Sequence, residues 1–157
     1  MIRIHALSHS NSRSGGFTLL EVLVALLVLS LGLLGLAALQ TVGIKFNQQS
    51  YQRTQATFYA YDILDRMRAN RTAAGTVNPI YSNITTTTYP GSTDCAATAC
   101  TADQMAEYDI RKWKDAIAAT LNQGVGQARV VSGRTREVIV GWVENDVPIS
   151  LAVQADL

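Results

Sequence analysis

An apolar run from Phe17 to Leu39 constrains this chain more than any other feature of its sequence. Between residues 22 and 39, Ser30 is the only residue with a polar side chain. As a helix rising 1.5 Å per residue, the run would be about 33 Å long, which is enough to cross the apolar core of a membrane.

The charges around this run predict its orientation. Arg3 and Arg13 precede it, and the next positive charge is Lys45. Because basic flanks stay in the cytoplasm, we expect a single-pass membrane helix with a cytoplasmic leader and an exported C-terminal part.

Charge elsewhere argues against two classes of partner. Charged residues make up 16% of the chain and the net charge is +1. Without residues 1–16, which hold two arginines, 11 basic and 12 acidic side chains remain. A near-neutral chain gives no electrostatic reason to expect binding to nucleic acid or to an acidic substrate.

Glu21 lies inside the apolar run, where a charge costs about 3 kcal/mol or more. A secretory signal peptide cut near Ala37–Ala38 is the plain alternative for this segment. Two features oppose it, namely the glutamate and the Gly15-Gly16 pair that ends the polar leader directly before the run.

The segment Gly16-Phe17-Thr18-Leu19-Leu20-Glu21 resembles the type III signal of type IV pilins and pseudopilins. The resemblance implies that a prepilin peptidase cuts between Gly16 and Phe17 and methylates the new N-terminal amine of Phe17. It divides the chain into a cleaved leader (1–16), a transmembrane and filament-core helix (17–40) and a periplasmic globular domain (41–157).

The same resemblance gives Glu21 a role in assembly. In the family, this glutamate is thought to neutralise the N-terminal ammonium of a neighbouring subunit as it enters the filament. Two isolated charges in apolar surroundings are expensive, whereas a matched pair is tolerated, so such a pair can fix the axial register of subunits.

The implied fold is the α+β type IV pilin fold, and the rest of the sequence fits it. No proline occurs between Phe17 and Asn70, so one long helix is allowed, with a membrane half and an amphipathic half. Ala56, Ala60, Ile63 and Met67 share one face of the second half and predict the side that packs on a small β-sheet.

A second, short helix is predicted after an irregular stretch at 71–101. Thr101 and Gln104 have the spacing of a capping box. The helix should end before Gln123-Gly124. Its apolar stripe, a core face, is formed by Ala106, Ile110, Trp113, Ile117 and Leu121.

Three β-rich segments follow, at 128–132, 136–143 and 149–155, separated by Ser132-Gly133 and Asn145-Asp146. They predict an antiparallel meander packed on the long helix. Three arginines, Arg129, Arg134 and Arg136, cluster near the first turn. We interpret them as a solvated hairpin tip rather than a DNA-binding surface, because no aromatic residues lie among them.

Cys95 and Cys100 favour a short disulfide loop in an oxidising compartment. The alternative is a zinc site, which needs two more ligands. The two histidines, His5 and His9, belong to the predicted leader, so we expect no metal site and no cofactor.

Further segments resemble minor pilins of the PilV family, the type IV pilus modification proteins. They are Gly32–Gln40, Asp65–Asn70, Asp94–Trp113 and Val138–Val143. This resemblance implies a subunit that joins other minor pilins in a priming or tip complex, starts assembly of the major pilin into a pilus, and supports adhesion and twitching motility. Its further partners would be the inner-membrane assembly platform and, before assembly, membrane lipid.

Three other functions compete with this interpretation. One is a DNA-uptake pilin, which would need surface arginine side chains that bind DNA in a salt-dependent way. A minor pseudopilin of a type II secretion system shares the helix, the glutamate and the processing. A signal-anchored periplasmic enzyme is the alternative from another class. It is disfavoured because no histidine remains after residue 16, no glycine-rich phosphate loop occurs, and the carboxylates show no convergent pattern.

Replacing the residue before the predicted cut tests the processing site. We expect Gly16→Val to block cleavage, since the resemblance implies a peptidase that cuts after a glycine, and to leave a product heavier by the mass of residues 1–16. Mass spectrometry of the membrane-extracted protein measures this, with Gly15→Ala as the matched control. A normal mature mass for Gly16→Val would refute the cleavage site.

Overall fold

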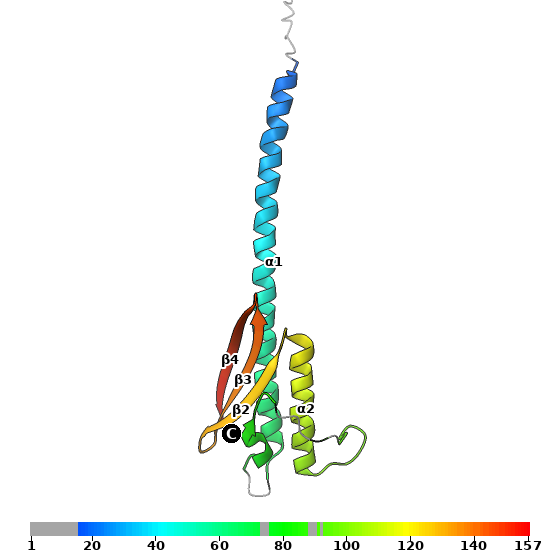
Figure 1. The fold of residues 1–157 in the computed structure, drawn as a ribbon, viewed down its shortest axis with the longest axis vertical. Coiled ribbons are helices and arrows are strands. Elements are labelled where there is room, and N and C mark those ends of the chain that lie inside the picture. The colour runs from blue at the N-terminus through cyan, green and yellow to red at the C-terminus, as the bar shows by residue number, and fades with distance from the viewer. Residues whose placement is uncertain (1–15, 73–75, 88–90, 92) are drawn as a thin grey trace, which may run out of the picture. The chain divides into compact units, whose positions relative to one another are not determined.

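Helix α1 (Leu19–Ala69) is the first element of the computed structural model, which describes residues 16–72, 76–87, 91 and 93–157 (Figure 1). It has 51 residues and confirms the predicted long helix to within two residues at each end. The predicted leader, apart from Gly16, lies outside the described residues, as do His5 and His9.

The chain divides into two units, Met1–Ile44 and Lys45–Leu157. In the first unit the described part is mainly the beginning of α1, and its side chains are exposed throughout. Large apolar side chains there range from 47% exposed at Val22 to 91% at Leu19. Among the described residues, α1 is the one helix long and apolar enough to cross a membrane.

The second unit contains a four-stranded antiparallel sheet in the order β1-β2-β3-β4. Its strands are β1 (Asn83–Ile84), β2 (Val125–Ser132), β3 (Thr135–Glu144) and β4 (Val147–Asp156). The predicted three-stranded meander is confirmed, and each of its strands is longer than expected.

Two tight turns fix the register of this sheet. Asn145 and Asp146 both have positive φ, of 49° and 62°, which suits a two-residue hairpin turn that pairs Glu144 with Val147. Gly133, with φ 47°, turns the chain between β2 and β3. The turn signals in the sequence therefore mark real strand ends.

Helix α2 (Ala102–Thr120) begins at the predicted capping box. The Gln104 amide donates to Thr101 Oγ1 at 3.3 Å, and the Thr101 amide donates to Gln104 Oε1 at 3.0 Å. All five residues of its predicted stripe are buried. Figure 1 shows α2 alongside the second half of α1.

Trp113 lies at the centre of the core, as expected. Its ring is fully buried, and its Nε1 donates to the Tyr59 carbonyl oxygen of α1 at 2.7 Å. A Cβ at Gly126 would come within 2.5 Å of the indole, so only glycine lets β2 pass this close to α2. The predicted core face of α1 is also confirmed, with Leu64 as an additional member.

The prediction that 71–101 is irregular throughout is wrong for residues 79–84. A 3-10 helix, η1 (Pro79–Ser82), is capped by Asn78, whose Oδ1 accepts from the Ile80 amide at 3.0 Å. Strand β1 follows and pairs with β2. Tyr81 and Ile84 are buried in the core, and this tertiary packing overrides the local turn signal of Asn78-Pro79. The predicted loop residues 88–90 lie outside the described part of the chain.

Candidate functional site

Thr18 and Glu21 form the start of α1. Thr18 Oγ1 accepts from the Glu21 amide at 3.2 Å, so Thr18 is the N-cap and Glu21 is the third helical residue. A carboxylate in the first turn is stabilised by the helix dipole. Glu21 thus has a local role in the helix, which the sequence analysis missed although the Thr-x-x-Glu spacing shows it.

The proposed cleavage junction lies just before this cap. Gly16 and Phe17 are exposed and precede the helix, and no heavy atom lies within 4 Å of where a Gly16 Cβ would be. Phe17 and Glu21 border one shallow groove, together with Val22, Ala25, Leu26 and Leu29. The structure therefore places the residue after the junction and the glutamate on one side of the helix start.

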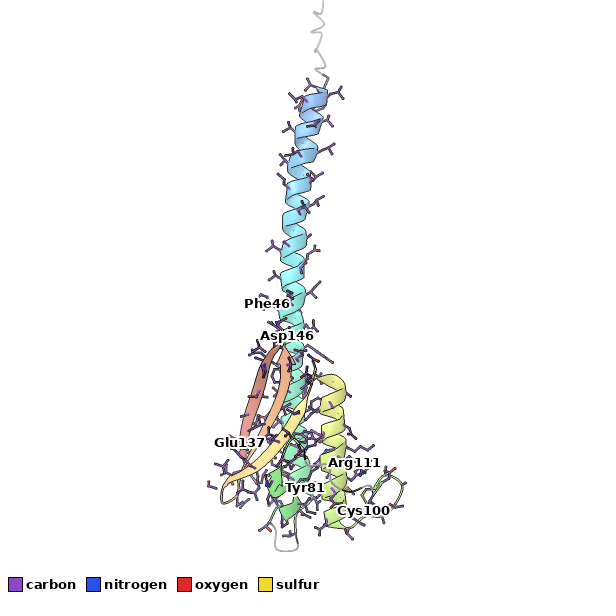
Figure 2. All side chains as sticks on the ribbon, in the orientation of Figure 1. Phe46, Tyr81, Cys100, Arg111, Glu137 and Asp146 are labelled. Atoms are coloured by element: carbon purple, nitrogen blue, oxygen red, sulfur yellow. A yellow bond between two sulfur atoms is a disulfide. The ribbon has the colours of Figure 1, made fainter. Side chains whose placement is uncertain are left out.

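The second unit presents aromatic side chains on the face of α1 opposite its core face. Tyr51, Phe58 and Tyr61 are 58%, 63% and 50% exposed. At 100° per residue they lie on the side away from Ala56 and Ile63. Phe46 also projects from the helix and is 63% exposed (Figure 2), but at 100° per residue it lies in line with Leu64 and is not part of this face. The sequence analysis did not single out this face, although the i, i+7 spacing of Tyr51 and Phe58 marks it.

A polar network joins α1, η1 and α2 inside the second unit. Asp109 is buried, and its two oxygens accept from Arg66 Nη1 at 2.8 Å and from the Tyr81 hydroxyl at 2.7 Å. Arg66 Nε also donates to Asp62 at 3.1 Å, one turn earlier on α1. The segments Asp65–Asn70 and Asp94–Trp113, both noted for their resemblance to minor pilins, meet here.

Tyr81 and Arg66 both keep their protons in this network, because the pKa of each is raised. Burial, and then the hydrogen bond to Asp109, raises the pKa of Tyr81 above its ordinary value. Burial alone would lower the pKa of Arg66, but Asp109 and Asp62 raise it above its ordinary value. Tyr81 therefore stays a donor and Arg66 a cation, and the arrangement reads as a structural clamp rather than a proton-transfer site.

Cys95 and Cys100 form a disulfide, as predicted, in the loop directly before the capping residue Thr101 (Figure 2). Both sulfurs are committed to this bond, so neither is free to bind zinc. Arg111 Nη2 donates to the Thr93 carbonyl oxygen at 2.7 Å and attaches the start of the loop to α2.

The three arginines near the β2–β3 turn are engaged by their own chain. Arg129 Nε donates to Glu137 Oε2 at 2.6 Å, and the Arg134 Nε donates to the Leu157 carbonyl oxygen. Arg136 is buried. The interpretation of a solvated hairpin tip is therefore confirmed for Arg129 and Arg134, which are exposed, and is wrong for Arg136, which packs into the domain.

Two family models match the chain. The model described as the prokaryotic N-terminal methylation motif matches residues 11–37, which contain Gly16, Phe17 and Glu21. The model described as type IV pilin Tt1218 matches residues 38–111, which contain Arg66 and the rest of the clamp. Searches of curated proteins and of solved structures returned no match.

Removing the charge of Asp109 tests the clamp. Asp109→Asn leaves Arg66 and Tyr81 without a carboxylate partner, so we expect a loss of about 2–3 kcal/mol in the free energy of unfolding. Urea unfolding of the full chain in detergent micelles, followed by tryptophan fluorescence, measures it. Asp65→Asn is the matched control, because its ion pair with Arg68 is largely exposed and should contribute about 0.5 kcal/mol or less. Equal losses from the two variants would contradict the clamp.

Proposed function

Because this chain belongs to the type IV pilin-like family, we propose that it is a minor pilin of the PilV kind, part of a priming or tip complex that starts pilus assembly. The observation that carries the proposal is the pairing of a methylation-motif N-terminus with a long helix whose apolar first half is exposed on all sides. The exposed apolar half of this helix can be covered by the same helices of other subunits in a filament.

We propose that processing occurs between Gly16 and Phe17, in a precursor whose leader is cytoplasmic and whose domain from residue 41 is periplasmic. The exposed, non-helical backbone at Gly16 and Phe17 supports access by a prepilin peptidase. Cutting before residues 17–40 rather than after them retains the apolar helix in the mature protein. A disulfide at Cys95–Cys100 fits the oxidising periplasm.

Glu21 is proposed to act in assembly. Cleavage creates an ammonium at Phe17, and the carboxylate lies one helical turn away on the same groove. Within one subunit the N-cap already positions Glu21 at the helix start. In a filament, the same carboxylate can neutralise the ammonium of the next subunit to enter, which fixes axial register at low cost in the apolar interior.

A role in priming follows from the cost of nucleation. The first subunits to leave the membrane lack neighbours that cover their apolar helices, and each exposed leucine then costs about 1.5–3 kcal/mol. A preferred complex of different minor pilins can lower this barrier. The aromatic face of α1, formed by Tyr51, Phe58 and Tyr61, supplies further surface for such contacts.

Deletion of the gene tests the function directly. We expect few surface pili and lost twitching when the retraction motor is active. When the motor is disabled, we expect pili to return in part, because pili that start slowly are then no longer retracted. Sheared pili are quantified in both backgrounds, beside a protein secretion assay. Unchanged pilus number would refute the priming role, and normal pili with failed secretion would identify a pseudopilin of a type II secretion system.

A further inference from the structure

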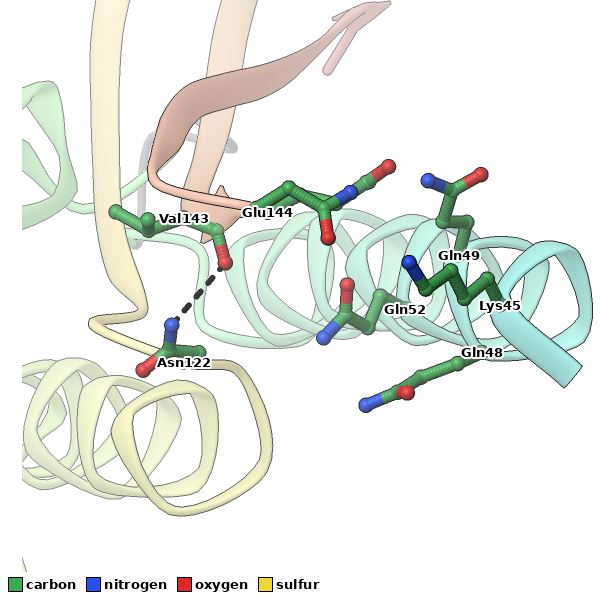
Figure 3. A pocket seen from close by; sticks show the side chains of 8 residues that line it. Lys45, Gln48, Gln49, Gln52, Asn122, Val143 and Glu144 are labelled. Atoms are coloured by element: carbon green, nitrogen blue, oxygen red, sulfur yellow. Dashed lines mark hydrogen bonds between the residues drawn. The ribbon is translucent and has the colours of Figure 1, made fainter. Parts of the chain in front are cut away.

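A polar pocket of about 240 Å³ opens beside the β3–β4 turn, within the second unit (Figure 3). Helix α1 supplies one wall, the end of β3 and the turn supply another, and Asn122 lies between α2 and β2. The lining residues are Lys45, Gln48, Gln49, Gln52, Asn122, Val143, Glu144 and Asn145. Nothing in the proposed function uses this pocket.

The wall of the pocket is well fixed. Asn122 Nδ2 donates to the Val143 carbonyl oxygen at 3.3 Å (Figure 3), and the Val143 amide donates to the Asn122 carbonyl oxygen at 2.9 Å. The next residue, Glu144, pairs with Val147 across the tight turn. The backbone that carries the Glu144 carboxylate is therefore held on both sides.

Two acceptor atoms in this pocket lack donors. Gln52 Oε1 and Glu144 Oε2 are buried, and neither has a hydrogen-bond partner among the described residues. Figure 3 shows the two side chains facing the same space from α1 and from β3. A buried acceptor without a donor costs about 1–3 kcal/mol, and more when it is charged. The pocket therefore favours an incoming group that donates hydrogen bonds and carries positive charge.

Lys45 is the one cation among the residues that line the pocket, but no ion pair between Lys45 and Glu144 occurs among the described residues. A divalent metal is also a poor match, because Glu144 is the one carboxylate that lines the pocket and such ions need several oxygen ligands with charge. A planar guanidinium, with donors fixed in a fork, can reach both unpaired oxygens at once.

We propose that this pocket receives an arginine side chain from a neighbouring pilin subunit, which donates to Glu144 and Gln52. The inference rests on the proposed function, because it requires a neighbour in an assembly. Its location supports it, since Lys45–Gln52 follow directly in sequence after the apolar part of α1 that the neighbours would cover. Paired, desolvated charges of this kind give contacts specificity and order of assembly.

The test uses the full chain in its own cells. The measured quantity is the ratio of the amount of subunit in sheared filaments to the amount in membranes. We expect Glu144→Lys to lower this ratio about tenfold or more, and Glu144→Gln to lower it less, because close charge pairs at interfaces contribute more than 1.4 kcal/mol. Asp115→Lys is the matched control, since Asp115 is an exposed carboxylate on α2 that does not line the pocket. Normal membrane levels and protease resistance verify folding.

A photo-cross-linking residue at Gln48, which is exposed at the pocket, identifies the partner. We expect a cross-link to an arginine-containing segment of another subunit, and an Arg→Glu change there should restore incorporation of Glu144→Lys. Wild-type behaviour of Glu144→Lys would mean that water alone fills the pocket. Equal losses from Lys45→Gln and Glu144→Gln without a cross-link would make Lys45 the partner. Either result overturns this inference while leaving the pilin assignment intact, whereas absence of the wild-type chain from filaments overturns both.

Discussion

Most of this structure depends on one constraint, which is that the first half of α1 is apolar on every side. Large apolar side chains from Phe17 to Leu39 remain about half exposed or more, so the chain by itself does not bury them. A membrane can cover this helix, and so can the same helices of other subunits. Under the proposed function this constraint explains why processing would retain the helix, why a charge lies at its start, and why the domain folds around its second half.

The sequence was sufficient for features that depend on local chemistry. The extent of α1 follows from an apolar run, an amphipathic run and the absence of proline. The start of α2 follows from the capping pair Thr101 and Gln104, which the structure reproduces as two reciprocal hydrogen bonds. The three long strands follow from β-rich segments and turn residues. The disulfide followed from excluding other partners for Cys95 and Cys100.

Features that depend on long-range contacts were not predictable in this way. Asp109 lies 43 residues from Arg66 and 28 from Tyr81, and no local pattern joins them. The same holds for β1, whose two residues form a strand only because β2 passes beside them. Two of the segments noted in the sequence, Asp65–Asn70 and Asp94–Trp113, meet at the clamp through the ion pair of Arg66 and Asp109, so contacts within the domain account for these residues.

The surfaces left for assembly are of three kinds. They are the apolar start of α1, the aromatic face formed by Tyr51, Phe58 and Tyr61, and the pocket beside the carboxylate of Glu144. Hydrophobic surface supplies most of the affinity in such assemblies, whereas buried charges select the partner and the register. We propose that Glu21 acts as such a charge, because a carboxylate inside an apolar helix contributes nothing to hydrophobic burial.

The most direct test of this account replaces Glu21 by glutamine. Glutamine also suits the third position of a helix capped by Thr18, so the change removes the charge and spares the cap. Cleavage after Gly16 should proceed normally, while the share of subunit in sheared filaments should fall about tenfold or more relative to Asp115→Asn, a matched change on an exposed face of α2. Normal incorporation of Glu21→Gln would contradict charge pairing as the basis of assembly for this subunit.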